Sequence, residues 1–265
     1  MSDLRIFSYL PNPRIWKATI AGRLCGVDVE VRGASPSELQ EWLWDFDARP
    51  IAGVAPGLLA DAERTGRIGF SGAKLFKTDA FLRAQPFGTV PAAFSPDGLT
   101  GIFESNSIMR TVARLGAERF PLYGRDPYEA SRIDSFLDVS LVFARDAQIY
   151  LLALRGETIS PGIHARATEA FITYAEGLER ALSPDRRFLV GDDVSLADIC
   201  FACELALFSN ERARGAALTK QGLTPVLKAA ESRFPLTFDH LDRLAAHSAF
   251  ESDLAPYLSK LKAAR

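Results

Sequence analysis

The residues best placed to do chemistry are a glutamate and a serine that open a helix shortly after a Val-Pro step. Glu104 and Ser105 begin a run that reads as helix to about Leu115, and a helix start presents unpaired N–H groups and a partial positive charge. The extended run beginning at Val90-Pro91 offers backbone N–H and C=O groups beside it. A carboxylate suits an ammonium group and a hydroxyl suits a carboxylate. The pattern therefore predicts a site for a small zwitterion.

The elements that must position this site form an α/β half followed by an all-helical half. Residues 4–10 read as a strand, residues 14–25 as a helix that stops at Gly26, and Val27–Val31 as an alternating strand. A crossover helix makes the two strands parallel. Two more short strands flank the turn at 95–98. We expect an N-terminal domain over 1–116, a linker, and an all-helical domain over 126–265.

Residues 34–80 are harder to interpret and read as a long insertion. Ser37–Phe46 has the composition of a helix, and the glycines and prolines after it indicate loops. A long structureless loop is unusual in a compact domain. The aromatic residues of this stretch favour a packed segment over a disordered one. We expect the insertion to cover the mouth of the site or to extend a subunit interface.

Together these motifs resemble the glutathione transferase family over most of the chain. The strand Leu4–Tyr9 leads through Pro11–Lys17 into a helix, as in that family, and Phe188–Ile199 looks like the buried capping element of its second domain. Asn12-x-Arg14-x-aromatic-Lys17 and the stretch from Phe81 to Pro91 are similar to the elongation factor 1B gamma subunit and to related bacterial and fungal transferases.

The resemblance implies a thioredoxin-like N-terminal domain, an all-α C-terminal domain, and glutathione as co-substrate. It implies that Val90 and a cis Pro91 bind the backbone of glutathione, and that Glu104 and Ser105 bind its γ-glutamyl end. One residue departs from the family pattern, since Thr89 stands where many members have a lysine before the Val-Pro step. Lys77, Arg83 and Gln85 are the candidates to replace this lysine.

The resemblance also implies a donor to the glutathione sulfur in the turn after the first strand, where three residues are candidates. Asn12 is the first choice, although capping the helix is the commonest task of Asn at this place, and the two roles are compatible. Arg14 either stabilises a thiolate by its charge or is a solvated first-turn side chain. Tyr9 either donates its hydroxyl or packs its ring in the core.

Composition narrows the class of protein further. A net charge of −2 argues against nucleic acid or an anionic membrane as the main partner, and no apolar run approaches the length needed to span a bilayer. Three cysteines without a secretory signal indicate a reducing cytoplasm. Cys200-x-x-Cys203 lies in an apolar run and reads as core. The three histidines have no ligand spacing, so we expect no metal site.

Two functions remain open from the sequence. In the first, the protein is a glutathione transferase whose thiolate attacks a hydrophobic, aromatic electrophile in a pocket near Phe143, Tyr150 and Trp42–Phe46. One version is cleavage of a β-aryl ether of lignin-derived compounds. In the second, it is a non-catalytic assembly module like the elongation factor 1B gamma subunit. The fold implies a two-fold dimer, either of identical chains or with a related subunit.

Overall fold

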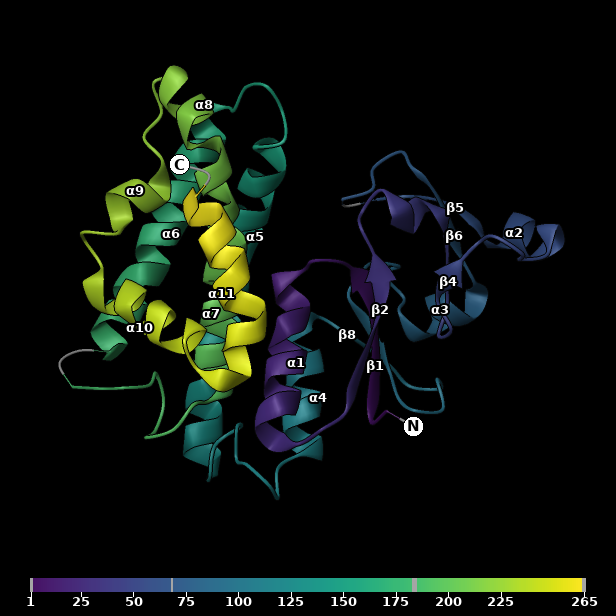
Figure 1. The fold of residues 1–265 in the computed structure, drawn as a ribbon, viewed down its shortest axis with the longest axis horizontal. Coiled ribbons are helices and arrows are strands. Elements are labelled where there is room, and N and C mark those ends of the chain that lie inside the picture. Colours follow the sequence, from purple (N-terminus) through teal and green to yellow (C-terminus); the bar gives the residue numbers. More distant parts are fainter. Residues whose placement is uncertain (1, 68, 183–184, 264–265) are drawn as a thin grey trace. The chain divides into compact units, whose positions relative to one another are not determined.

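A computed structural model of the chain describes residues 2–67, 69–182 and 185–263. The chain forms two compact units, Met1–Phe120 and Pro121–Arg265, whose elements are drawn in Figure 1. The N-terminal unit combines strands and helices, and the described part of the C-terminal unit contains helices and connecting turns. This is the α/β half followed by a helical half that the sequence predicts.

The first sheet of the N-terminal unit has four strands in the order β2-β1-β7-β8. These strands are β1 (Leu4–Tyr9), β2 (Val29–Ala34), β7 (Ala92–Phe94) and β8 (Gly101–Phe103). β1 runs parallel to β2 and antiparallel to β7, so that Ile6 lies opposite both Val31 and Ala93. The parallel pairing of the first two strands, predicted from their crossover helix, is confirmed.

Two helices pack together beside this sheet, α1 (Pro13–Cys25) and α4 (Ser105–Leu115). α1 begins after Asn12, whose backbone is extended, and stops at Gly26, whose φ of 66° is left-handed. Glycine adopts that conformation without the clash of a Cβ. The start and the stop of α1 agree with the sequence because both are local signals. A shorter helix, α3 (Asp79–Ala84), precedes β7.

Residues of the insertion form a second four-stranded sheet in the order β4-β3-β6-β5. Its elements are β3 (Trp42–Trp44), β4 (Arg49–Pro50), α2 (Pro56–Ala62), β5 (Glu63–Thr65) and β6 (Lys74–Lys77). The helix predicted over Ser37–Phe46 is therefore wrong. Only Glu38–Glu41 makes a 3-10 turn, and Trp42–Trp44 pairs in parallel with β6. The partner strand comes from a distant part of the chain, which no local pattern reveals.

The insertion shares a core with the first sheet. Phe7 and Phe94 of the first sheet lie in one buried cluster with Trp44 and Leu75 of the second sheet and Phe81 of α3. The rings of Trp44 and Phe81 stand edge-on to Phe7, with centroids 5.3 and 6.3 Å away. The prediction that the aromatic residues favour packing is confirmed, and the insertion is part of the folded body of this unit.

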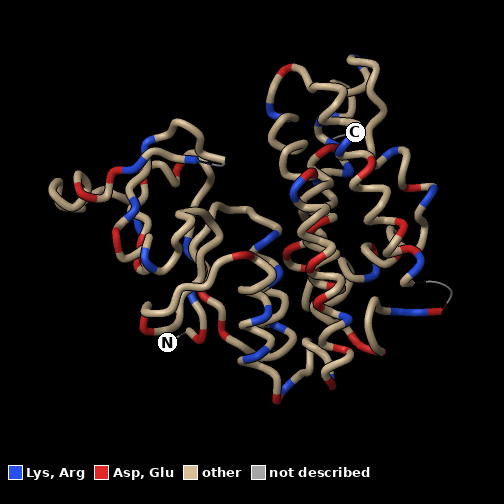
Figure 2. The backbone as a smooth tube through the Cα atoms, turned by 180° about the vertical axis from the view of Figure 1, so that it is seen from behind, with Lys and Arg blue, Asp and Glu red and all other residues tan. Residues whose placement is uncertain are grey.

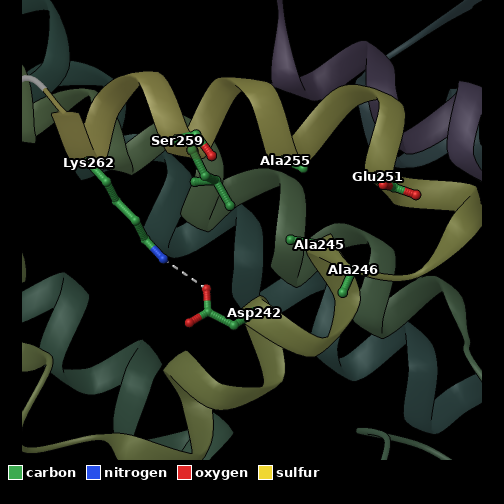
Figure 3. Close-up of a pocket in the computed structure, with 8 residues that line it drawn as sticks. Asp242, Ala245, Ala246, Glu251, Ala255, Ser259 and Lys262 are labelled. Carbon is green, nitrogen blue, oxygen red and sulfur yellow. Dashed lines mark hydrogen bonds and ion pairs between the residues drawn. The ribbon is translucent and has the colours of Figure 1, made fainter.

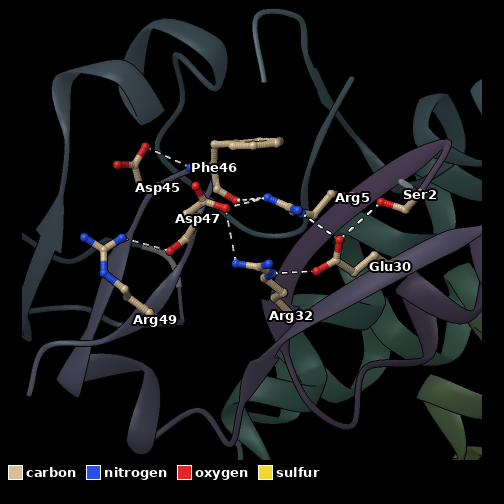
Figure 4. A network of polar contacts seen from close by, with 8 residues as sticks. All are labelled: Ser2, Arg5, Glu30, Arg32, Asp45, Phe46, Asp47 and Arg49. Carbon is tan, nitrogen blue, oxygen red and sulfur yellow. Dashed lines mark hydrogen bonds and ion pairs between the residues drawn. The ribbon is translucent and has the colours of Figure 1, made fainter. Parts of the chain in front are cut away.

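A network of charged side chains also joins the two sheets (Figure 4). Arg5 Nε donates to Glu30 Oε2 at 2.8 Å and Arg5 Nη1 donates to Asp47 Oδ1 at 2.6 Å. Arg32 Nε donates to the other oxygen of Glu30 at 2.7 Å. The hydrogen bond from Arg32, followed by that from Arg5, lowers the pKa of Glu30 to about 2. The guanidinium of Arg5 also lies over the ring of Phe46, 4.2 Å from its centre.

The C-terminal unit is built on long helices. Its α-helices are α5 (Pro127–Ala153), α6 (Pro161–Leu182), α7 (Leu196–Phe208), α8 (Gly215–Lys220), α9 (Val226–Ala230), α10 (Pro235–Ala245) and α11 (Ser248–Ala263). α5 packs against both α6 and α7. Cys200 and Cys203 are buried within α7, which confirms their interpretation as core residues. Pro127 stands in the first turn of α5, where a proline is compatible with the helix.

The start of α7 is closed by its own side chains. Ser195 and Asp198 form the capping box that the sequence predicts. Asp198 is fully buried and accepts hydrogen bonds from the backbone N–H of Leu189 and Ser195, each at 2.9 Å. His240 Nε2, from α10, lies 2.8 Å from the same carboxyl group. One side chain therefore joins the preceding loop, the helix start and α10.

Candidate functional site

The Val90–Pro91 peptide bond is cis, as the resemblance implies. Pro91 directly precedes β7, the strand that pairs with β1 on one side and β8 on the other. The bond therefore lies where the chain enters the middle of the sheet. A second cis bond, Leu10–Pro11, lies directly after β1, in the turn that leads into α1. The sequence analysis did not single out this second bond, and an X-Pro step alone is a weak signal for it.

Glu104 has an unusual backbone at the start of α4. Its φ of 66° is the only positive value at a non-glycine position in the described part of the chain. Such a conformation costs about 1–3 kcal/mol for a residue with a Cβ, and it occurs most often at functional sites. The carboxylate is exposed and makes no capping hydrogen bond to the helix that it precedes. The side chain of Glu104 is thus available to a ligand.

A buried lysine of α1 holds the other residue of the predicted pair. Lys17 is 1% exposed, and its Nζ donates to Ser105 Oγ at 3.3 Å and to Asn106 Oδ1 at 2.8 Å. A hydroxyl that accepts from an ammonium group keeps its own proton to donate. Ser105 is therefore oriented to donate to a carboxylate, next to the partial positive charge of the α4 start. The sequence analysis gave Lys17 no role, since buried lysines are rare.

Two buried side chains hold the loop that leads into Val90. Lys77 Nζ, at the end of β6, donates to the carbonyl oxygen of Gly88 at 2.6 Å, and burial lowers the pKa of this lysine. Gln85 Nε2 donates to the carbonyl and to the hydroxyl of Thr89, at 3.1 and 2.9 Å. Arg83 is exposed. Of the three residues considered as replacements for a lysine at position 89, two bind the backbone of this loop.

In the turn after β1, the structure gives Asn12 its capping role. Asn12 Oδ1 accepts from the backbone N–H of Arg14 at 3.0 Å, and its Nδ2 donates to the buried Ser8 Oγ at 3.0 Å. Asn12 is itself only 1% exposed. Tyr9 and Arg14, the other two candidates, are half-buried. Lys17 links this first stretch of α1 to Ser105, so the turn and the start of α4 belong to one site.

Two residues predicted to line an electrophile pocket do not do so. Phe143 and Tyr150, both on α5, lie in the aromatic core of the C-terminal unit. The Phe143 ring stacks on Tyr174 at 4.7 Å, and the Tyr150 hydroxyl donates to the buried Glu211 at 2.7 Å. Their prediction as pocket residues is wrong, because an aromatic residue on an apolar helix face packs in the core as readily as in a pocket.

A cavity of about 320 Å³ lies between α10 and α11, and none of the predicted site residues lines it. Figure 3 shows its lining of alanines and the ion pair between Lys262 Nζ and Asp242 Oδ1, which are 3.1 Å apart. Both charged side chains are more than half exposed. An exposed pair of this kind binds weakly, so the lining provides little to select a ligand.

The surface carries both signs of charge in both units (Figure 2), as expected from a net charge of −2. Within residues 2–67, 69–182 and 185–263, the acidic, histidine and cysteine side chains form no group of three close enough to hold a metal ion. No helix in these described ranges is both long and apolar enough to cross a bilayer.

Comparison with known proteins places this arrangement in a family context. Residues 166–247 match the model of the glutathione S-transferase C-terminal domain. Over 140 residues, or 52% of the chain, the sequence is 34% identical to elongation factor 1-gamma of Trypanosoma cruzi, and it spans about a third of that relative's length. It is 32% identical to glutathione S-transferase F9 of Arabidopsis thaliana over 46% of the chain and 59% of that relative.

The solved structures extend the similarity over both units. A glutathione S-transferase from Methylobacterium radiotolerans, in complex with glutathione sulfonate, covers 95% of the chain with a TM-score of 0.61 and 18% identity. The match includes 94% of that protein. At this level of identity, the likeness establishes the fold. The two units thus have the glutathione transferase fold, and residues 166–247 match the glutathione S-transferase C-terminal domain.

Proposed function

We propose that the N-terminal unit binds glutathione and that the chain is a glutathione transferase. The observation that carries the proposal is the open, strained start of α4, where Glu104 has a left-handed backbone and an exposed carboxylate. Ser105, held by Lys17, lies next to it. An acceptor for an ammonium group and a donor to a carboxylate are the two groups that an α-amino acid terminus needs.

In this proposal the γ-glutamyl end of glutathione binds at α4. Its ammonium group pairs with Glu104, and its carboxylate accepts from the Ser105 hydroxyl and from the first N–H groups of the helix. The cysteinyl backbone of glutathione pairs with Val90, ahead of the cis Pro91. The solved relative that holds glutathione sulfonate supports this choice of ligand, since it has the same fold.

The turn after β1 then activates the thiol. A thiol titrates near 8.5, and lowering its pKa by roughly two units requires about 2.7 kcal/mol of preference for the thiolate. One hydrogen bond to a charged group contributes about 1.5–3 kcal/mol. A single donor among Tyr9, Arg14 and Asn12 is therefore enough. Since the Asn12 amide already binds Ser8 and the Arg14 N–H, comparing alanine variants at the three positions will identify the donor.

The proposed reaction is a displacement on a hydrophobic, aromatic electrophile. The thiolate sulfur forms a bond to the carbon that carries the leaving group, and that group departs with the bonding electrons. For a β-aryl ether of lignin-derived compounds, the C–O bond breaks and the phenolate leaves, later to take up a proton. Three buried cysteines suit a reducing cytoplasm as the place of action.

The first experiment is calorimetric titration of glutathione into the wild type, Glu104→Ala and Asp97→Ala. Asp97 is an exposed acidic residue of the turn between β7 and β8, so it controls for loss of a negative charge. We expect micromolar-to-millimolar binding to the wild type and to Asp97→Ala, and at least tenfold weaker binding to Glu104→Ala. Equal affinity in all three would refute the assignment of Glu104.

A broad screen with glutathione and an aryl halide or a β-aryl ether then tests catalysis. The alternative is a non-catalytic binding module, which the similarity to elongation factor 1-gamma supports. A chain that binds glutathione but turns over neither substrate class favours this second function. Co-purification with translation factors would then establish the alternative, and turnover abolished by a first-turn alanine variant would exclude it.

A further inference from the structure

Lys17 is a charged side chain in the interior of the N-terminal unit. It lies on α1 and is only 1% exposed, although a lysine is almost never fully buried in a protein. Burying an ammonium group costs free energy that its contacts must offset. A methionine of similar length would fill the same space without this cost. The charge of Lys17, and not its bulk alone, therefore calls for an explanation.

The ammonium group of Lys17 contacts the first two side chains of α4. Its Nζ donates to Asn106 Oδ1 at 2.8 Å and to Ser105 Oγ at 3.3 Å. Both acceptors are buried, Asn106 at 2% and Ser105 at 7% exposure. The shorter bond to Asn106 fixes the position of the cation, so the charge is in place behind Ser105 before a ligand arrives.

The hydroxyl of Ser105 connects this cation to the start of α4. A hydroxyl accepts through its lone pairs and has one proton to donate, so the bond from Lys17 leaves that proton free to point elsewhere. Hydrogen bonds in a chain polarise one another, and more strongly where the surroundings exclude water. The proton of Ser105 therefore attracts an anion more strongly than the proton of a serine that has no cation behind it.

We propose that Lys17 is a positioning residue that makes the start of α4 selective for a carboxylate over a neutral group of the same shape. The inference rests on the proposed function, in which the γ-glutamyl carboxylate of glutathione accepts from Ser105. Lys17 does not touch the ligand and acts through the Ser105 hydroxyl. The thiols that the site accepts are then γ-glutamyl compounds with a free α-carboxylate, and an amide or an ester at that carbon is rejected.

The burial of Lys17 is what makes its charge effective. An exposed cation is screened by water and salt, whereas a buried one is screened much less. Glu104, on the exposed side, offers the opposite charge to the ammonium group of the same ligand. Two charges of opposite sign at one end of the site favour a zwitterion over a ligand that has lost either of its charges.

The test is calorimetric titration of the full chain with glutathione and with the analogue whose γ-glutamyl α-carboxylate is a carboxamide. The two ligands have nearly the same shape and differ in one charge. We expect the wild type to bind glutathione at least about tenfold more tightly than the carboxamide. Lys17→Met should remove most of this preference, by weakening glutathione binding while leaving carboxamide binding nearly unchanged. Arg23→Met, which removes an exposed cation of the same helix, is the control and should keep the preference.

A second variant separates the charge of Lys17 from its hydrogen bonds. Lys17→Gln keeps a donor for Ser105 and Asn106 without the charge, so it remains informative if the methionine variant does not fold, and it should also lose the preference. Adding Ser105→Ala to Lys17→Gln should change the preference no further, because the two residues act as one chain.

The ratio of the two affinities distinguishes positioning from a general loss of structure, which would weaken both ligands by the same factor. An equal loss for both ligands in the Lys17 variants, or a Lys17→Gln protein that keeps the preference, would overturn the inference. So would a wild type that binds glutathione and the carboxamide equally well, and in each of these cases the proposed function would stand. A wild type that binds neither ligand would refute the proposed function and this inference with it.

Discussion

The starts of α4 and α7 are two helix N-termini of one chain that differ in their capping. At α7, Ser195 and Asp198 form a closed capping box, and Asp198 is fully buried and bonded to two backbone N–H groups and to His240. At α4, Glu104 has a strained backbone, an exposed carboxylate and no capping hydrogen bond. At the start of α7 the side chains of Ser195 and Asp198 cap the helix, whereas at the start of α4 the side chain of Glu104 provides no cap.

The comparison shows that a helix N-terminus can be built for stability in one place and, as proposed, for binding in another. A cap stabilises a helix by about 0.5–2 kcal/mol, so a helix that forgoes one and adds strain is destabilised unless a ligand supplies the missing contacts. The proposed glutathione site is therefore expected where the fold is locally unfavourable.

The largest effect is expected at Asp198. Replacing it with alanine leaves two buried backbone N–H groups and the ring of His240 without an acceptor, which should lower the free energy of unfolding by about 3–5 kcal/mol. Urea unfolding measures it, with the exposed Asp192→Ala as control. Glutathione affinity of the folded protein should stay unchanged. A loss below about 1 kcal/mol would contradict the role given to this network.

Glu104 should behave in the opposite way. Glu104→Gly relieves the left-handed strain and should raise the free energy of unfolding by up to about 1 kcal/mol. The same change should weaken glutathione binding about 10- to 100-fold, because a charge-assisted contact is lost. Glu104→Ala keeps the strain and should lose the binding without the gain in stability. If Glu104→Gly were less stable than the wild type, the backbone of Glu104 would not be a source of strain.

Lys77 should have a smaller effect on binding. Lys77→Met removes the donor to the Gly88 carbonyl and loosens the loop before Val90, so we expect glutathione to bind about tenfold more weakly, near 1.4 kcal/mol. Lys74→Met, on the same strand but exposed and paired with Glu63, should bind normally. Rescue by Lys77→Arg, which keeps a donor, would show that the hydrogen bond matters. Equal affinity for both methionine variants would exclude a positioning role.

The smallest effect is expected at Glu30. Its carboxylate is partly exposed, whereas that of Asp198 is buried. Its pKa is about 2 in the folded protein, below the value near 4.3 of an unfolded chain. The folded state therefore gains stability from this ion above pH 4 and loses that gain as the pH falls toward 2. Glu30→Gln should be less stable than the wild type at pH 7, and the gap should close near pH 2. A gap that persists there would point to packing instead.

Sequence reasoning works best where the signal is local. Asn12 and Gly26 delimit α1, and Ser195 and Asp198 mark the start of α7, because caps and stops act on their own helix. The strand Trp42–Trp44 escaped prediction because its partner, β6, lies far along the chain.

Family motifs named the expected ligand-facing residues of the candidate site, but not the side chains that support them. Glu104, Ser105 and the cis Pro91 follow from family motifs. The support that Lys17 gives does not, since a sequence alone places lysines on the surface. Lys77 is named from the sequence only as a candidate to replace a lysine at position 89, not as a support of the loop before Val90. The structure buries both and uses each ammonium group as a donor to a neighbouring segment. The sequence also leaves open whether Asn12 caps α1, donates to the thiol or does both. The hydrogen bonds of Asn12 show the capping role.

The core shared by the two sheets limits how this protein can be shortened or grafted. Trp44 and Leu75 of the second sheet pack in one cluster with Phe7 and Phe94 of the first, and Lys77 reaches from β6 to the loop before Val90. Cutting out residues 42–77 would remove three of the eight buried residues of this cluster and a support of the proposed site at once. The second sheet is therefore part of the smallest piece of this chain that keeps the first sheet's core intact.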